Sequence, residues 1–234
     1  MQPYDTHSML IQMFHVYKRY GAKNALVDIN LEVADSEFLF ISGPSGAGKS
    51  TLLRLLYMGE AATRGQIIID GQNLSRIPRR RIPFLRRKFG IIFQDYKLIP
   101  TRTAYENIAL VAEAVGTRRS LVKKKVSSLL RTVGMADRAR ALPPSLSGGE
   151  QQRIAVARAM AGNPKIIIAD EPTGSLDAES AAEIMGLLRH YHRLGATVIV
   201  ATHDTELIRS MGGRVVLLKG GHLEISTVIP RLSS

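Results

Sequence analysis

The segment that most constrains how this chain can fold is a glycine-rich loop between a buried strand and a helix. The loop follows the apolar run 38–41, precedes helix-forming residues 50–58, and reads Gly43-Pro44-Ser45-Gly46-Ala47-Gly48-Lys49-Ser50. Its glycines let backbone N–H groups surround an anion where a side chain would clash. Lys49 can neutralise phosphate charge, Ser50 can offer its hydroxyl to Mg²⁺, and Thr51 continues the helix whose positive end faces the anion. The pattern predicts a nucleotide bound by an α/β fold.

A second glycine pair lies about a hundred residues further on, in Leu146-Ser147-Gly148-Gly149-Glu150. Ser147 is a suitable N-cap for the helical run 150–161, which carries Arg153 and Arg158, so this segment can form another N-terminal anion site. One chain has no evident way to bring this segment onto its own phosphate loop. A symmetric head-to-tail dimer would complete two equal pockets. The nucleotide on one copy would then contact four residues of the other, namely Ser147, Gly148, Gly149 and Glu150.

Polar residues follow three of the buried strands that we expect. Asp170 and Glu171 end the apolar run 166–169, His203 follows the run 197–201, and Gln94 follows 89–93. In α/β sheets ligands bind at the carboxyl edge of the strands, where these side chains would gather. We expect Asp170 to hold Mg²⁺ through water, Glu171 to polarise the attacking water, and His203 to contact the γ-phosphate. The Gln94 amide could sense Mg²⁺ or the same water.

Composition excludes several other classes of protein. The chain has 234 residues, 45% of them hydrophobic, and contains no cysteine, so disulfides, thiolate metal sites and a catalytic cysteine are ruled out. Residues 1–9 are polar and mixed, and no run approaches the roughly 18 apolar residues that a membrane span needs. We therefore expect a cytosolic protein, or one held at a membrane by something else.

The net charge of +12 comes largely from two stretches. Their members are Arg76, Arg79, Arg80, Arg81, Arg86, Arg87 and Lys88, and then Arg118, Arg119, Lys123, Lys124 and Lys125. Two solvated helix faces would explain them, as would an anionic neighbour, either the inner leaflet of a membrane or nucleic acid. Phe84 is the one aromatic residue among these charges, which weakens the case for a platform that stacks single-stranded bases. Charge alone leaves both explanations open.

The apolar pattern predicts strands interrupted by a helical lobe. Alternating or continuous apolar runs predict strands at 9–17, 26–33, 38–41, 66–69, 89–93, 165–169, 197–201 and 214–218. Asp70-Gly71 is a hairpin turn signal. From about 95 to 162 the spacing is helical, with amphipathic helices expected at 103–115 and 121–133. A further helix is expected at 178–194. The chain is thus predicted to be a mixed α/β core carrying a helical lobe.

With these motifs in place, the chain resembles the ATP-binding cassette (ABC) ATPases over essentially its whole length. The family's motifs occur in order: 43–50 as Walker A, Gln94 as the Q-loop, 146–150 as the signature, 166–171 as Walker B with the catalytic glutamate, Ser175-Leu176-Asp177 as the D-loop, and His203 as the switch histidine. The resemblance implies a P-loop NTPase (RecA-like) core, an antiparallel β-subdomain and an inserted helical subdomain. It places one ABC domain over 1–234, with its catalytic core at 1–94 and 163–234 and its helical subdomain at 95–162.

The same resemblance implies hydrolysis of ATP with Mg²⁺. The implied catalytic residues are Glu171, His203, Lys49 and Gln94, and the implied metal-site residues are Ser50, Gln94 and Asp170. Tyr20 matches the aromatic residue that stacks on adenine. Tyr17 is the competing candidate, and Tyr20 is preferred for its distance from the following strand. Stacking of this kind tolerates different bases, so nucleotide selectivity could be loose.

Within the family the chain resembles the cell-division ATPases of the FtsE type. The resemblance rests on Leu85-Arg86-Arg87 and on residues 91–100, 102–107 and 169–174, and Asp95 after the glutamine favours this branch over ATPases for lipoprotein release or macrolide export. It implies a homodimer on the cytoplasmic face of the bacterial inner membrane. There residues 94–107 would contact an integral membrane subunit of the FtsX type and so regulate cell-wall hydrolysis.

Two other functions stay open at this point. A true transporter ATPase would share every catalytic residue, and a nucleic-acid-associated ABC ATPase is suggested by the charge, although the long insertions or double cassettes of such relatives are missing. Two features depart from the FtsE pattern. Ser175 replaces the usual asparagine of the D-loop, and the extension over residues 1–8 is longer than usual.

Overall fold

A computed structural model of the chain describes residues 9–229, so the N-terminal extension noted above lies outside the described residues. The chain separates into two compact units. The first unit contains the residues up to Arg86 and those from Thr197 onward, and the second unit contains Arg87–Ala196. Over residues 9–229 no helix combines the length and the apolar character that crossing a membrane requires.

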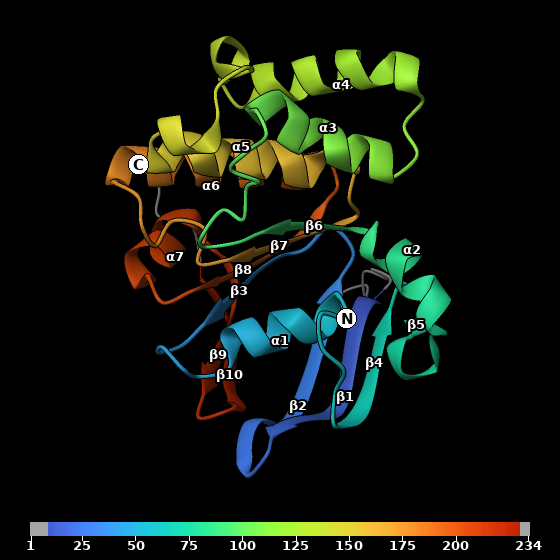
Figure 1. Ribbon diagram of the computed structural model, residues 1–234. Helices are drawn as coiled ribbons and strands as arrows, with labels where there is room; N and C mark the ends of the chain where they lie inside the picture. Colours follow the sequence, from blue (N-terminus) through green and yellow to red (C-terminus); the bar gives the residue numbers. More distant parts are fainter. Residues whose placement is uncertain (1–8, 230–234) are drawn as a thin grey trace, which may run out of the picture. The chain divides into compact units, whose positions relative to one another are not determined.

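The first unit contains an antiparallel sheet in the order β2-β1-β4-β5 (Figure 1). Its strands are β1 (Met9–Tyr20), β2 (Lys23–Ala34), β4 (Arg64–Ile69) and β5 (Gln72–Asn73). Ile69 pairs with Gln72, and the two residues between them, Asp70 and Gly71, have φ values of 50° and 72°. Positive φ at both central residues is the requirement of a tight hairpin turn that matches strand twist. The predicted strands and their turn are therefore confirmed.

The same unit holds strands β10-β9-β3-β8 of a second sheet. Their bounds are β3 (Phe38–Ser42), β8 (Thr197–Thr202), β9 (Gly213–Lys219) and β10 (His222–Ile229). β3 runs parallel to both β8 and β9, and every residue of β8 is buried, which explains its continuous apolar sequence. Helix α1 (Lys49–Leu56) follows β3, and α7 (Thr205–Met211) follows β8. The sequence pattern did not indicate β10 or α7.

A short helical stretch follows β5 and ends at Arg86, where the first chain segment of this unit ends. It contains the 3₁₀ helices Leu74–Arg76 and Arg79–Arg81 and then α2 (Ile82–Arg86). Pro78 lies between the two 3₁₀ helices, and Pro83 lies in the first turn of α2, where the missing N–H of proline is tolerated. The stretch carries most of the first basic cluster.

The second unit consists mainly of four α-helices and two parallel strands (Figure 1). The strands are β6 (Phe89–Ile92) and β7 (Ile166–Asp170), and the helices are α3 (Ala104–Ala114), α4 (Arg119–Thr132), α5 (Gly148–Met160) and α6 (Ala178–Arg193). Short 3₁₀ helices at Ala136–Arg138 and Pro143–Ser145 lead into α5. A Cβ at Gly90 would lie 2.7 Å from the Ala159 carbonyl oxygen, so α5 packs directly on β6. The helices predicted between 103 and 194 are confirmed.

Capping side chains determine where the helices of the second unit begin. Thr103 caps α3 and Ser147 caps α5, each in a reciprocal capping box with a glutamate three residues on. Asp177 caps α6 by accepting the Ser180 N–H at 2.8 Å. The hydrogen bond from that backbone N–H lowers the pKa of Asp177 below its usual range. The mixed α/β architecture is as predicted, whereas the boundary of the helical subdomain at 95–162 stays a prediction.

Candidate nucleotide site

Backbone geometry makes glycine necessary at several positions of the phosphate loop between β3 and α1. Gly43 has φ 152°, and a Cβ there would lie 2.0 Å from the Leu218 carbonyl oxygen. Gly48, at the N-cap of α1, has φ 110°, and a Cβ there would lie 2.7 Å from the Ala25 carbonyl oxygen. Gly46 also has positive φ but faces open space. The loop is therefore pressed against β9 and β2, with glycine required for conformation and for space.

The Lys49 side chain is buried and bonds to its own loop. Its ammonium donates to the Gly43 carbonyl at 2.8 Å and to the Pro44 carbonyl at 3.3 Å. Phosphate oxygens, which carry negative charge, would accept stronger bonds from this ammonium than the neutral carbonyls do. Ser50 and Thr51 follow in the first turn of α1, where the helix presents its free N–H groups. The loop thus has the donors and the charge that a polyphosphate needs.

His203 lies at the same sheet edge as the start of the phosphate loop, within the first unit. Ser42 of β3 pairs with Thr202 of β8 in parallel register, so Gly43 and His203 are the next residues at the same carboxyl edge. Thr202 then accepts the Asp204 N–H at 3.1 Å, and Asp204 caps α7. These bonds fix the turn that carries His203 at the edge where α/β sheets bind ligands.

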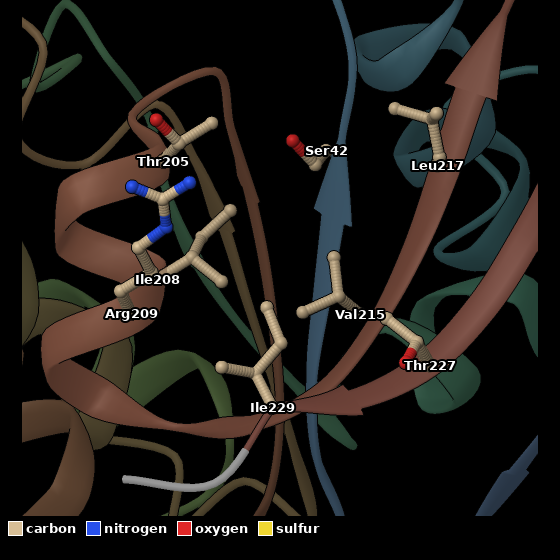
Figure 2. Close-up of a pocket in the computed structure, with 8 residues that line it drawn as sticks. All are labelled: Ser42, Thr205, Ile208, Arg209, Val215, Leu217, Thr227 and Ile229. Atoms are coloured by element: carbon tan, nitrogen blue, oxygen red, sulfur yellow. The ribbon is translucent and has the colours of Figure 1, made fainter. Parts of the chain in front are cut away.

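An apolar cavity of about 240 Å³ lies in the same unit next to Ser42. Figure 2 shows Ile208 of α7, Val215 of β9 and Ile229 of β10 around it. Such a lining offers few donors to a polyphosphate, which carries several negative charges. The anion-binding chemistry of this unit therefore belongs to the phosphate loop.

Gln94 and Glu171 both lie near Gly174 in the second unit. β6 and β7 pair in parallel with Ile92 opposite Ala169, so both residues lie just beyond the same edge. A Cβ placed on Gly174 would be 3.5 Å from the Gln94 amide nitrogen and 3.7 Å from the Glu171 Cβ. Glu171 has φ 47°, and its carbonyl accepts the Gly174 N–H at 3.2 Å, which turns the chain sharply after β7. Asp170, half-buried, ends the strand immediately before.

The second glycine motif is packed against two neighbouring segments of its own unit. A Cβ on Gly148 would lie 2.8 Å from the Tyr96 hydroxyl, and one on Gly149 would lie 2.6 Å from the Ser180 Oγ. Ser147 Oγ accepts the Glu150 N–H at 3.2 Å, and the Glu150 carboxylate accepts the Ser147 N–H at 2.8 Å. The motif is thus a preformed helix N-terminus that touches the segment after Gln94.

Arg158 has a contact that the sequence did not indicate. Its guanidinium donates to the Tyr96 carbonyl at 2.7 Å and to the Lys97 carbonyl. Both acceptor residues have positive φ, 58° and 50°. Burial lowers the pKa of Arg158 from its usual value. This arginine therefore holds the turn that follows Gln94, and only the fold could reveal it, because carbonyl acceptors leave no trace in the sequence.

The other arginine of α5, Arg153, pairs with Glu183 of α6. Both arginines that the sequence places on this helix therefore make contacts inside their own unit, and the anion site at the helix start stays a prediction. Both lie beyond the first turn of α5, where the free N–H groups are.

The candidate base-stacking residue Tyr20 ends β1 and is 42% exposed. Its hydroxyl donates to Glu60, and the Lys18 ammonium lies 4.8 Å from its ring centroid. The Glu60 carboxylate also accepts from Lys18 at 3.0 Å and from Arg54 at 3.2 Å. These hydrogen bonds, with that from the Tyr20 hydroxyl the strongest, lower the pKa of Glu60 to about 2. Tyr17 is half-buried. The preference for Tyr20 over Tyr17 stays a prediction.

The candidate residues divide between the two units. The phosphate loop, Tyr20 and His203 belong to the first unit, and Gln94, Glu171 and the second glycine motif belong to the second. Within each unit the polar residues lie at the carboxyl edge of parallel strands or at a helix N-terminus. Both are places where phosphate ligands bind.

Comparison with known proteins decides the family. The ABC transporter family matches residues 26–174, a range that contains the phosphate loop, the second glycine motif and the Asp170-Glu171 pair. The chain belongs to the ABC transporter family. As an ABC cassette it is an ATPase, and nucleotide binding follows from the same membership.

Among curated relatives of this ABC ATPase are cell-division ATP-binding proteins called FtsE. The FtsE of Bacillus subtilis is 44% identical over 91% of this chain and 93% of the relative. The FtsE of Mycobacterium tuberculosis is 44% identical over 92% and 94%, and that of Escherichia coli K12 is 41% identical over 92% and 97%. The resemblance to the FtsE branch is confirmed.

Solved ABC cassettes have the same fold. A dimeric structure of the cassette MJ0796 matches with a TM-score of 0.88 and 36% identity, covering 94% of this chain and 99% of that one. A dimeric post-hydrolysis structure of MJ0796 bound to ADP and Pi matches with a TM-score of 0.87 and 35% identity over the same shares. The predicted fold class, a P-loop core with an antiparallel β-subdomain and a helical subdomain, is confirmed.

Proposed function

We propose that this ABC ATPase is the ATP-hydrolysing subunit of a membrane complex of the FtsE–FtsX type in bacterial cell division. The observation that carries the proposal is the identity of 41–44% with FtsE proteins of three genera over more than nine-tenths of the chain. ATP hydrolysis would change the conformation of the membrane subunit and thereby regulate cell-wall hydrolysis. The chain itself would lie on the cytoplasmic face of the membrane, held there by that subunit.

The proposed chemistry is attack of water on the γ-phosphate of ATP. Glu171 would orient and polarise the water together with Gln94, as the position of both residues near Gly174 supports. Lys49 would leave its loop carbonyls to neutralise charge on the β- and γ-phosphates, and His203 would contact the γ-phosphate. Tyr20 would stack on adenine.

Magnesium fits the residues that the proposal assigns to it. Ser50, Gln94 and Asp170 offer hydroxyl, amide and carboxylate oxygens, which are the hard donors that Mg²⁺ prefers. Bound there, Mg²⁺ would screen phosphate charge during the reaction. Asp170 would act through water and Ser50 directly.

The active form would be a head-to-tail homodimer. Ser147, Gly148, Gly149 and Glu150 of one copy would face the nucleotide on the phosphate loop of the other. Their preformed helix N-terminus supports this role, because its free N–H groups are suited to an anion. The dimeric structures of MJ0796, one of them bound to ADP and Pi, are a precedent in the same family.

Substitution of the proposed water-orienting residue tests the chemistry. Glu171→Gln should lower ATP turnover by at least about 100-fold, because the amide is a poor proton acceptor, while nucleotide affinity stays within about threefold. Glu179→Gln, an exposed glutamate in the first turn of α6, is the matched control and should keep full activity. A Glu171→Gln protein with wild-type turnover would refute the role given to Glu171.

The membrane partner is tested separately. The wild-type chain, extracted from membranes in mild detergent, should co-purify with a multi-span membrane protein, and cells depleted of the chain should fail to separate. Recovery of a transporter subunit instead, with normal division on depletion, would favour the lipoprotein-release or macrolide-export alternative. Either result is compatible with the Glu171 test, so the chemistry and the biological role are judged independently.

A further inference from the structure

The segment from Leu74 to Arg86, here called the arginine segment, presents basic side chains and an aromatic ring on the surface of the first unit. Phe84 is 60% exposed, more than most large hydrophobic side chains of the described residues. The exposed residues around it are Arg76, Pro78, Arg79, Arg80, Arg81, Pro83 and Arg86. The sequence contains no aspartate or glutamate between Asp70 and Asp95. The segment therefore combines positive charge with an exposed apolar ring.

The arginine segment is anchored to the unit at both ends. Leu74 and Leu85 are only 4% and 2% exposed. Arg86 donates to the Met58 carbonyl at 2.6 Å and to the Tyr57 carbonyl at 3.3 Å, at the end of α1. The outward position of the remaining residues is thus set by buried leucines and a helix-end contact, rather than by a loose loop.

The arginine side chains between these anchors are not paired with acidic groups of the described residues. Within residues 9–229, the side chains of Arg76, Arg79, Arg80 and Arg81 make no hydrogen bond or ion pair. Other arginines of the same unit are paired, as Arg214 is with Glu37 at 3.0 Å. Holding three consecutive unpaired arginines together is unfavourable through their mutual repulsion. An anionic surface would remove that penalty.

We propose that the arginine segment binds the surface of an anionic phospholipid membrane directly, without the membrane subunit. Arg79, Arg80 and Arg81 would donate to headgroup phosphates, and guanidinium groups suit this because they are weakly hydrated and form forked bonds. Phe84 would enter the interfacial layer between headgroups and acyl chains. A phosphate-rich nucleic acid is disfavoured, because binding of single strands uses several stacked aromatic rings and this segment has one.

The second basic stretch, on α4, provides the contrast. It carries Lys123 and Lys124 and an exposed leucine, Leu121, at 49% exposure. Its cations are mainly lysines, which are strongly hydrated point charges, and its apolar residue is not aromatic. Because weakly hydrated arginines suit phosphate better than lysines do, α4 is the weaker candidate and a suitable control.

Insertion of Phe84 can be measured with one fluorophore, because the chain contains no tryptophan. The full-length Phe84→Trp protein should show a blue shift of its emission with vesicles of 30% phosphatidylglycerol in phosphatidylcholine, and none with pure phosphatidylcholine. Leu121→Trp, the matched control on α4, should show no shift with either vesicle. If the Phe84→Trp protein co-sediments with the anionic vesicles while its tryptophan emission stays unshifted, the proposal is overturned.

Removal of the arginine charges is the second test of membrane binding. The triple variant Arg79→Ser, Arg80→Ser, Arg81→Ser should bind the anionic vesicles on the order of 100-fold more weakly, at about fivefold per arginine. The matched triple variant Arg119→Ser, Lys123→Ser, Lys124→Ser should lose less than about tenfold. Both should keep the basal ATPase activity of the wild type, which shows that they fold. Equal losses, or binding of duplex DNA but not of vesicles, would overturn the proposal.

Discussion

Single cationic side chains hold several turns of this ATPase by donating to backbone carbonyls. Arg158 bonds to the carbonyls of Tyr96 and Lys97, and Arg86 bonds to that of Met58. These three acceptor residues all have φ between 50° and 58°. For residues other than glycine such a conformation costs about 1–3 kcal/mol. A guanidinium that satisfies the exposed carbonyls offsets part of this cost, so these arginines stabilise strained turns.

Arg158→Met should loosen the turn after Gln94. We expect turnover to fall about tenfold with a smaller change in the KM for ATP, because Gln94 would lose its position beside Glu171 while the phosphate loop is untouched. Unfolding free energy should fall by about 2 kcal/mol through loss of two hydrogen bonds to a charged group. Arg158→Lys should restore part of the turnover. Steady-state kinetics measure the turnover, and urea unfolding measures the unfolding free energy. The control is Arg131→Met, at an exposed position on α4.

A loss of stability in Arg158→Met without any loss of turnover would contradict this positioning role. It would leave Arg158 as a structural residue of the helical subdomain only.

The Glu60 cluster predicts a pH dependence of stability. The folded pKa of Glu60, about 2, lies below the unfolded value of about 4.3, so its contribution is fully present above pH 5 and is lost as the pH falls toward 2. Glu60→Gln should therefore destabilise the protein by about 1 kcal/mol at pH 6 and by less at pH 3. Urea unfolding at the two pH values measures this. A difference that is the same at both would mean that Glu60 titrates normally in the folded protein.

At the scale of elements, α3 and α5 begin with the same device used for different purposes. Thr103 and Ser147 each accept the N–H of a glutamate three residues on, and each glutamate bonds back, with distances of 2.7–3.2 Å. Both caps satisfy donors that a helix leaves free at its start. Only Ser147 is also proposed to face a nucleotide.

Substitution of each capping residue separates its contribution to helix stability from any contribution to ATP hydrolysis. Thr103→Ala and Ser147→Ala should each lower the unfolding free energy by about 1 kcal/mol. Ser147→Ala should in addition lower ATP turnover at least about fivefold, whereas Thr103→Ala should leave the turnover of the purified protein unchanged. Thermal unfolding and ATPase assays on the pair decide this. Equal turnover in the two variants would remove Ser147 from the proposed pocket.

The same elements show how far sequence reasoning reached. Strands with strict or continuous apolar patterns, such as β3 and β8, were predictable because burial dictates their composition. So were helices that open with a cap and close at a glycine, such as α3. Edge strand β10 was missed because its residues lack a clear pattern, with exposed Val228 and Glu224.

For the site, the sequence predicted the positions of the functional residues better than the contacts that hold them. Motif spacing predicted which residues follow which strand, and the register of β3 with β8 and of β6 with β7 bears out their common edges. The support around them could not be predicted, because Arg158 and Arg86 act on carbonyls and every residue carries one. Contacts of Gly149 with Ser180 depend on helix packing in the same way.

At the scale of the whole molecule, the two segments proposed to form a nucleotide pocket belong to different units of one chain. The phosphate loop belongs to the first unit and the Ser147 motif to the second. The proposed head-to-tail pairing of two copies would give two identical pockets, each made of one segment from each copy. The proposed cell-division role presupposes that this pairing drives the conformational cycle.

Mixing two inactive variants tests that pairing most directly. Lys49→Ala and Ser147→Arg should each abolish ATP hydrolysis alone, because every pocket of either homodimer is defective. Mixed in equal amounts, they form heterodimers that contain one intact pocket, so hydrolysis should return to at most about a quarter of the wild-type rate. No recovery in a mixture shown by cross-linking to contain heterodimers would contradict a pocket shared between two copies.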